Sequence, residues 1–288
     1  MNSSSVDNSS AFMGFQYPYE KSKVAILQMP YEGTSTYIKG QAKAPKAIID
    51  ASQQVETYDI ELEKDFIDEI GFHTLPPLKC GNLGPEEAID LLQKETSKIL
   101  KNNKFPIIFG GEHSISLGAV KAAKEKFEDL CVLQIDAHAD MRDEYENSKF
   151  NHACVMSRVR EIAPVVSVGI RSYCIEEAEL IKNKYFDAIF GPKLNEEVIN
   201  KIISKIKSKY VYITIDVDGF DPSIMPAVGT PEPGGLGWHE TLSLLRKVCS
   251  KKNVIGADIV ELAPIEGQIY SDFTCAKLAY KLAGYCLI

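Results

Sequence analysis

Short apolar runs alternate with amphipathic segments along most of the chain. The apolar runs have the length and composition of buried strands, and they lie at 23–29, 106–109, 131–135, 165–169, 186–190, 210–215 and 254–259. Between them, apolar residues recur at the spacing of one helical face. This spacing predicts helices at 45–52, 85–101, 115–127, 152–162, 175–184, 195–208, 239–250 and 271–285. Such alternation is typical of βαβ units, which form a parallel sheet covered on both faces.

One long stretch, 55–85, does not fit this alternation, and its prolines and glycines mark loops. No repeat of fixed period and no change in composition divides the chain, so we expect a single α/β domain at 23–288. Residues 1–22 begin with MNSSSVDNSS, which is rich in Ser and Asn and lacks both the basic and the apolar region of a signal peptide. We therefore expect a flexible N-terminal segment there.

The composition narrows the class of protein. With 288 residues, of which 45% are hydrophobic and 25% charged, the chain can bury a full core. The net charge is −8 and no basic stripe is visible, which argues against a nucleic-acid partner. No apolar run reaches the length of a membrane span, which argues against a membrane protein. Seven scattered cysteines without a CxxC pair fit a reduced, cytoplasmic protein.

Residues 132–140, VLQIDAHAD, begin as a buried strand and end in three polar side chains, Asp136, His138 and Asp140. In an extended chain, residues two apart share a face, so these side chains converge. Any one of them could be a helix cap or a satisfied polar group. Three of them together, at the carboxyl end of a strand where α/β sheets bind ligands, indicate a divalent metal site.

Two further strands end in residues of the same kind. His113 follows the expected strand at 106–109, within the sequence GGEHS. Asp216 and Asp218 follow the expected strand at 210–215 and again share a face. The double glycine before His113 could also cradle a phosphate, but no Gly-Lys-Ser/Thr follows it, so a nucleotide P-loop is unsupported.

The charge of these residues indicates two metal ions rather than one. Asp136, Asp140, Asp216 and Asp218 would bring about four negative charges to one place, and they would repel one another strongly without cations. Two divalent cations would neutralise them. Oxygen-rich sites of this kind favour Mn²⁺ over Zn²⁺. Asp221, which precedes a proline, is more typical of a turn than of a metal ligand.

The three segments FGGEHSISLGAVKA, VLQIDAHAD and TIDVDGFDPS occur together, with GTPEPGGL at 229–236 and KAPKAI at 43–48. This combination resembles the ureohydrolase family, which includes arginases and agmatinases, and the resemblance covers about residues 23–286. It implies a three-layer α/β/α fold around a mostly parallel, eight-stranded sheet. It also implies a binuclear manganese centre that hydrolyses a guanidinium group to urea and an amine.

The resemblance assigns six ligands to two Mn²⁺ ions per chain. One ion would be held by His113, Asp136, Asp140 and Asp216. The other would be held by Asp136, His138, Asp216 and Asp218, with Asp136 and Asp216 bridging the two.

The same comparison implies three catalytic residues. His152 resembles the family's proton-shuttling histidine, although alone it could be a helix cap or a surface residue. Glu261 resembles the glutamate that holds the guanidinium, a task that suits a carboxylate because guanidinium stays charged and presents paired donors. Otherwise Glu261 could be a solvated loop residue. Asp140 would help to stabilise the tetrahedral intermediate.

The loop at 141–151 bears on the choice of substrate. It is acidic, with Asp143, Glu144 and Glu146, and is similar to the Asp-Glu-aromatic-Glu pattern of agmatinases rather than to the Asn/Thr/Ser-rich loop of arginases. Carboxylates would repel the α-carboxylate of arginine and favour an ammonium tail. We therefore expect agmatine to bind at Asp143 and Glu144 and to yield putrescine. Two basic residues in the loop weaken this argument, and the acidic side chains could instead be exposed to solvent without binding a substrate.

Other functions fit parts of this pattern. An arginase or another guanidino-acid hydrolase would use the same centre on a small cationic guanidino substrate. A deacetylase-like amide hydrolase would use a single zinc ion, and a catalytically silent relative would tolerate a degraded ligand set, which is not what the sequence has. The resemblance also implies a homo-oligomer, either a trimer or a hexamer, although no interface signature is visible in the sequence.

Overall fold

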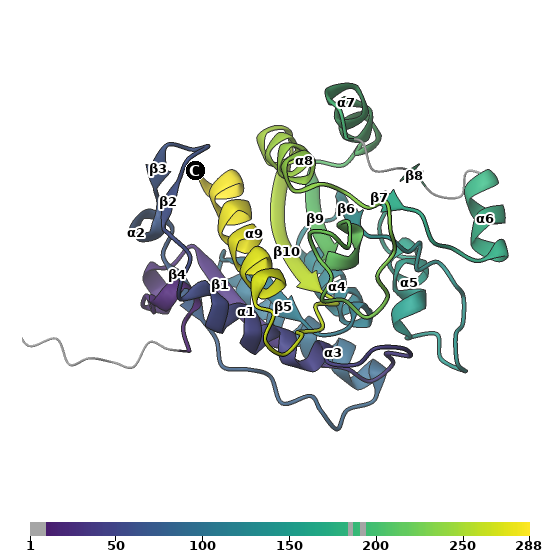
Figure 1. Ribbon diagram of the computed structural model, residues 1–288, viewed down its shortest axis with the longest axis horizontal. Helices are drawn as coiled ribbons and strands as arrows, with labels where there is room; N and C mark the ends of the chain where they lie inside the picture. The colour runs from purple at the N-terminus through teal and green to yellow at the C-terminus, as the bar shows by residue number, and fades with distance from the viewer. Residues whose placement is uncertain (1–9, 184–186, 191–193) are drawn as a thin grey trace, which may run out of the picture.

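The computed structural model describes residues 10–183, 187–190 and 194–288. Among these residues, eight strands form one sheet in the order β4-β1-β5-β10-β9-β6-β7-β8, and all neighbouring strands are parallel (Figure 1). Their bounds are β1 Val24–Met29, β4 Phe72–Thr74, β5 Phe105–Gly110, β6 Leu130–Ile135, β7 Val165–Ile170, β8 Asp187–Phe190, β9 Tyr210–Asp216 and β10 Asn253–Val260. The expected parallel sheet is confirmed.

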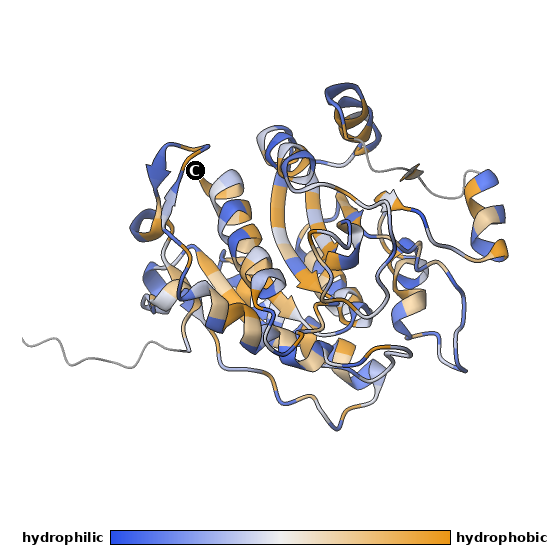
Figure 2. Ribbon diagram, viewed as in Figure 1, coloured by the Kyte–Doolittle hydropathy of each residue, from blue (hydrophilic) through white to orange (hydrophobic). Residues whose placement is uncertain are grey.

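Helices cover both faces of this sheet. One apolar core lies between the sheet and α1 (Ala44–Ser52), α7 (Glu196–Lys205), α8 (Trp238–Lys251) and α9 (Tyr270–Leu287). The other core lies between the sheet and α3 (Pro85–Lys101), α4 (Ser116–Lys126), α5 (Val155–Arg160) and α6 (Ile175–Lys182). The central strands are largely hydrophobic, as expected for strands buried on both faces (Figure 2). The three-layer α/β/α fold is therefore confirmed.

The expected elements correspond to observed ones, with shifted ends. The helix expected at 152–162 begins as a short 3-10 helix, His152–Cys154, and continues as α5. The last residue of the helix expected at 175–184 and the first residue of the strand expected at 186–190 lie outside the described residues. No helix within the described part of the chain has both the length and the apolar character that crossing a bilayer requires.

The stretch at 55–85 contains the strand that the hydrophobic pattern missed. Strand β4 has only three residues, Phe72–Thr74, so it is too short to show an alternation. It pairs with β1 at one edge of the sheet. Before it come a small antiparallel pair, β2 (Tyr58–Asp59) and β3 (Lys64–Asp65), and the short helix α2 (Ile67–Ile70).

Part of the expected flexible N-terminal segment belongs to the folded domain, which corrects the boundary at residue 22. Phe12 is fully buried, and its ring packs against those of Phe72 and Phe109 at centroid distances of 5.5 and 5.6 Å. Its backbone N–H donates to Thr74 Oγ1 at 2.9 Å. Residues 1–9 lie outside the described residues. The segment was expected to be flexible because of its Ser/Asn-rich start, but that composition ends at Ser10, before Phe12.

The ends of α3 show how local sequence sets a helix. The helix begins with Pro85, whose missing N–H costs nothing in a first turn. Glu87 accepts a hydrogen bond from the backbone N–H of Gly84 at 2.8 Å. Acidic residues occupy the first turn, and Lys98 and Lys101 occupy the last, so both ends complement the helix dipole.

Helices α3 and α4 pack closely because residue 118 of α4 is glycine. A Cβ on Gly118 would lie 2.3 Å from the carbonyl oxygen of Ile89 in α3.

The burial of Phe12 predicts a stability cost for its removal. We expect Phe12→Ala to lower the free energy of unfolding by about 3 kcal/mol, because it leaves a cavity between two aromatic rings. Denaturant unfolding measures this change. Phe15→Ala is the matched control, since Phe15 is 41% exposed and its truncation is expected to cost under about 1 kcal/mol. Equal effects of the two substitutions would contradict the packing described for residue 12.

Candidate metal centre and active site

The polar residues singled out in the sequence meet at the carboxyl ends of four adjacent strands. In the sheet order, β5, β10, β9 and β6 are neighbours. The chain leaving these strands carries His113, Glu261, the pair Asp216 and Asp218, and the trio 136–140, respectively. Residues from four separate parts of the sequence therefore converge on one edge of a parallel sheet, where α/β proteins bind their ligands.

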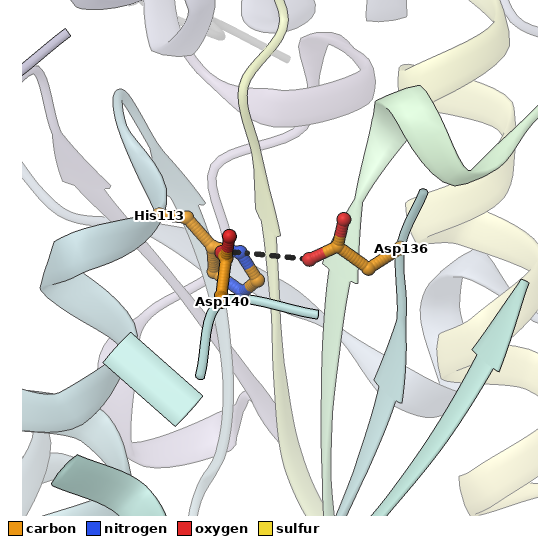
Figure 3. A group of neighbouring side chains, drawn as sticks. All are labelled: His113, Asp136 and Asp140. Atoms are coloured by element: carbon orange, nitrogen blue, oxygen red, sulfur yellow. Dashed lines mark ion pairs between the residues drawn. The ribbon is translucent and has the colours of Figure 1, made fainter. Parts of the chain in front are cut away.

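The first group of potential ligands surrounds His113. Its Nδ1 lies 3.1 Å from Asp136 Oδ2, 3.0 Å from Asp140 Oδ2 and 3.4 Å from Asp216 Oδ2. Figure 3 shows His113 and Asp140 close together, with Asp136 reaching toward them from its strand. All four side chains are buried. This arrangement matches the ligand set expected for one of the two metal ions.

The second group is centred on Asp136 and Asp218. His138 Nδ1 lies 2.9 Å from Asp218 Oδ2 and 3.8 Å from Asp136 Oδ1. Asp136 therefore turns one oxygen to each group, which fits its expected bridging position. Asp216 presents Oδ2 to the first group, while its Oδ1 accepts the N–H of Asp218 at 2.9 Å.

The atoms of the first group are arranged to coordinate a cation rather than to hydrogen-bond with one another. Although His113 Nδ1 is surrounded by three carboxylate oxygens, it has no hydrogen-bond partner of adequate geometry among the described residues. Buried polar atoms are rarely left without a partner. An atom aimed at the common centre of several carboxylates, rather than at any one of them, is positioned as a metal ligand. The donor set of carboxylates and imidazoles fits a hard divalent ion.

A buried network holds His113 in this orientation. Its other ring nitrogen, Nε2, lies 2.8 Å from Thr214 Oγ1, which donates to Asp258 Oδ1 at 2.6 Å. Tyr212 donates to the other oxygen of Asp258 at 2.8 Å. Partners of this kind fix the tautomer of a metal-binding histidine, so that in the neutral ring Nδ1 is the nitrogen with the lone pair. Nothing in the sequence distinguished Thr214 or Asp258 from ordinary strand residues.

Crowding of buried charges shifts the pKa values of the cluster. Burial, followed by the charges of Asp140 and Asp218, raises the pKa of Asp136 to about 7. Burial and the same kind of repulsion raise the pKa of Asp216 well above its usual value. Burial alone would lower the pKa of His138, but the carboxylates of Asp218, Asp136 and Asp140 outweigh it and raise that pKa to about 11. Without cations, protons bound to these side chains therefore offset the repulsion between the carboxylates.

Glu261 and His152, the expected catalytic residues, line the same cavity of about 330 Å³ as Asp140, Asp216 and Asp218. Glu261 accepts the backbone N–H of His113 at 2.6 Å and the amide of Gln41 at 3.2 Å. Burial, and next the charge of Glu112, raise the pKa of Glu261 to about 8.

The backbone is strained at two of these residues. Asp140 and Glu261 have φ values of 52° and 64°, in the left-handed region that non-glycine residues rarely adopt. Such conformations persist where the surrounding structure enforces them, and they concentrate at functional sites. Here the backbone oxygen of Asp140 accepts the N–H groups of Met156 and Ser157, and the N–H of Glu261 donates to the backbone oxygen of Gly111.

The structure does not support the expected substrate contacts of Asp143 and Glu144, which are exposed and do not line the cavity. The carboxylate of Asp143 pairs instead with Arg158 at 2.5 Å and with Lys149 at 3.5 Å. Both residues therefore lie on the surface, outside the lining of this cavity. The same loop contributes Arg142 and Tyr145 to the cavity wall. The guanidinium of Arg142 lies over the aromatic ring of Tyr145.

Asp221 forms a turn, as its position before a proline predicted. One carboxylate oxygen accepts the N–H and the hydroxyl of Ser223, and the other accepts the N–H groups of Gly234 and Gly235. These hydrogen bonds lower the pKa of Asp221 to about 2. They tie the segment at 229–236, which includes the cavity-lining residue Thr230, to the end of β9.

Comparison with known proteins identifies the family to which this site belongs. A sequence model of a protein family, described as Arginase family, matches residues 22–285. The chain belongs to the Arginase family. Its members are binuclear metal-dependent, and the two groups found among the described residues are candidate metal-binding clusters of that kind.

Individual relatives within the Arginase family agree on the type of enzyme. The chain is 44% identical to an N(1)-aminopropylagmatine ureohydrolase of Synechocystis sp., over 93% of this chain and 90% of that protein. It is 36% identical to an agmatinase of Bacillus cereus, over 86% of each. The crystal structure of agmatine ureohydrolase of Thermoplasma volcanium matches with a TM-score of 0.87 and 32% identity, covering 99% of this chain and 95% of that one. The expected enzyme class is confirmed: the chain is a ureohydrolase.

The charge state of the cluster predicts that metal binding releases protons. In the metal-free enzyme the neighbouring carboxylates raise the pKa of His138 to about 11 and raise that of His113 as well, which favours protonated imidazoles, whereas a metal ligand must be neutral. We expect Mn²⁺ binding to release at least about one proton per chain at pH 7, and the apparent affinity to rise with pH. Calorimetric titration in buffers of different ionisation enthalpy measures the number of protons. A binding enthalpy that is independent of the buffer would contradict the protonated cluster.

Proposed function

We propose that this enzyme hydrolyses the guanidinium group of an unbranched guanidino-amine, so that urea and a primary amine are released. The observation that carries this proposal is the shared cavity. Glu261, His152 and three carboxylates of the candidate metal centre, those of Asp140, Asp216 and Asp218, line one hollow of a size suited to a small ligand. The complete ligand set and the membership of the Arginase family support a catalytic protein over a silent relative.

Two Mn²⁺ ions fit this cluster, and six residues would hold them: His113, Asp136, His138, Asp140, Asp216 and Asp218. Bound divalent ions of this kind supply a water molecule that is acidic enough to act as a nucleophile near neutral pH. The oxygen-rich donor set favours Mn²⁺ over Zn²⁺. Because Asp136 faces both groups of ligands, the cluster suits a pair of ions better than the single zinc of a deacetylase-like hydrolase.

The chain's own residues would bind the substrate and move a proton. Glu261 would hold the guanidinium, since a buried carboxylate matches its charge and its paired N–H donors. Ionisation of Glu261 is disfavoured by burial, and a bound cation would offset that cost. His152 would give a proton to the departing nitrogen, which leaves poorly as an anion. Asp140 lines the same cavity and would help to stabilise the tetrahedral intermediate.

The charge of the cavity favours a substrate with a cationic tail. Once two divalent ions balance the four aspartates, Glu177 and Glu261 remain among the described lining residues against the single arginine Arg142. Because the guanidinium would match Glu261, the argument rests on the net negative charge of the cavity as a whole, which favours a dicationic guanidino-amine over a substrate with an added carboxylate. This argument replaces the one from Asp143 and Glu144, and it disfavours arginine and guanidino acids.

Within this class we propose N(1)-aminopropylagmatine as the substrate, with agmatine as the second candidate. Sequence similarity supports this order, because the Synechocystis relative with 44% identity is named for the longer substrate and the Bacillus cereus agmatinase has 36% identity. Removal of urea from the longer compound leaves a triamine, and removal from agmatine leaves putrescine. Either product would place the enzyme in polyamine biosynthesis.

A substrate panel tests this order. We expect N(1)-aminopropylagmatine to have the highest kcat/KM for urea release by the Mn²⁺-loaded enzyme, followed by agmatine. Arginine and guanidinobutyrate are expected to be at least about tenfold poorer than agmatine, because their carboxylates reduce the positive charge that a cavity of net negative charge attracts. A higher kcat/KM for agmatine would reverse the first assignment, and a preference for arginine would refute the argument from the net charge of the cavity.

Substitution of the bridging aspartate separates the metal centre from the acidic loop. We expect Asp136→Asn to lower bound manganese, measured by elemental analysis, and to reduce kcat at least about a hundredfold, because Asp136 faces both groups of ligands. Asp143→Asn, which also changes a carboxylate to an amide, is the control. Since its carboxylate faces Arg158 on the surface, both kcat and KM should stay within about twofold of the unaltered enzyme. Full activity of Asp136→Asn, or of a metal-free sample, would exclude this centre as the site of reaction.

A further inference from the structure

Thr34 lies between a buried carboxylate and the proposed proton donor. Its hydroxyl oxygen is 2.7 Å from Glu112 Oε1 on one side. On the other side it is 3.0 Å from the backbone nitrogen of His152 and 3.2 Å from His152 Nδ1. The two partners come from distant parts of the chain, and 118 positions separate Thr34 from His152. Thr34 itself belongs to the loop between β1 and the 3-10 helix Gln41–Lys43.

Glu112 determines the direction of the hydroxyl hydrogen. Its side chain is fully buried, and it accepts from the backbone N–H groups of Thr34 and Ser35 at 2.6 and 3.1 Å and from the Ser114 hydroxyl at 2.5 Å. A carboxylate surrounded by donors accepts hydrogen bonds and cannot donate them. The hydrogen of the Thr34 hydroxyl must therefore point to Glu112.

The direction of that hydrogen fixes the tautomer of His152. A hydroxyl has one hydrogen and two lone pairs, so with its hydrogen given to Glu112, Thr34 can only accept from His152. It accepts from the backbone N–H and from the ring, which means that Nδ1 carries a hydrogen. The remaining ring nitrogen, Nε2, is then the one that can take up or release a proton.

We propose that Thr34 is a positioning residue for the reaction, because it fixes the His152 tautomer that leaves Nε2 as the proton-transferring atom. This inference rests on the proposed function. As the C–N bond of the substrate breaks, its electron pair stays on the departing amine nitrogen, which takes the Nε2 proton of the imidazolium. The Nδ1 hydrogen remains directed to Thr34. A buried carboxylate that acts through a hydroxyl thus serves the same purpose as a carboxylate in direct contact with a catalytic histidine.

The Thr34 hydroxyl can be removed without removing the attachment of its loop. The backbone N–H groups of Thr34 and Ser35 also bind Glu112, and these bonds persist in a Thr34→Val variant of nearly the same shape. We expect Thr34→Val to lower kcat about tenfold or more with KM within about twofold, since proton transfer is impaired while substrate binding is retained. Thr34→Ser, which restores the hydroxyl, should keep at least about half of kcat.

A matched control removes a different hydroxyl from the same carboxylate oxygen. Ser114 also donates to Glu112 Oε1, but its hydroxyl has no contact with His152 among the described hydrogen bonds. We expect Ser114→Ala to change kcat by less than about threefold. Thermal unfolding of all variants shows whether each one is folded.

A double-mutant cycle decides whether Thr34 acts through His152. In a His152→Asn background, Thr34→Val should change the residual kcat by less than about twofold, because the group that it positions is gone. If Thr34→Val is equally harmful with and without His152, or if it raises KM rather than lowering kcat, the inference is overturned. Likewise, a Thr34→Ser variant as impaired as Thr34→Val would overturn it. If the unaltered enzyme releases no urea from any guanidino-amine, the proposed function fails and this inference fails with it, which is a distinct result.

Discussion

Four buried aspartates at one edge of the sheet are the constraint on which the rest of this structure depends. Like charges so close together are strongly unfavourable in a medium of low polarity. Without cations the site is balanced by protons, as the raised pKa values of Asp136 and His138 show. A pair of divalent ions would replace those protons and turn an unfavourable cluster into a reactive centre. The repulsion that makes the cluster unfavourable alone thereby gives it affinity for metal.

The fold meets this constraint by placing the aspartates on neighbouring strands and by surrounding them with oriented groups. Because β5, β10, β9 and β6 are adjacent, their ends form a continuous line of ligand positions. Outside the ligands, Asp258 acts through Thr214 on His113, and Glu112 acts through Thr34 on His152. In both cases a buried carboxylate orients an imidazole through a hydroxyl, so one arrangement would serve metal binding and the other the proposed proton transfer.

The proposed substrate preference rests on the lining of the cavity rather than on the chemistry of the centre. The ligand set by itself does not distinguish one guanidino compound from another. The cavity adds Glu177 and Arg142 as well as the aromatic ring of Tyr145, all contributed by loops that follow the site strands or by the start of α6. Loops vary more easily than strands, so the same centre can serve different guanidino substrates.

The sequence by itself determined most of the elements and the candidate ligand residues, because both depend on short-range patterns. Alternating strands and helices follow from hydrophobic periodicity, and Asp136, His138 and Asp140 converge because extended chain repeats every two residues. Tertiary structure alone decided the three-residue strand β4, the burial of Phe12, and the direction in which Asp143 points. It also decided that Thr34 contacts His152 and that Gln41 contacts Glu261, across 118 and 220 positions. The partner of a polar side chain is set by which distant segment packs beside it, and a local sequence pattern carries no information about that.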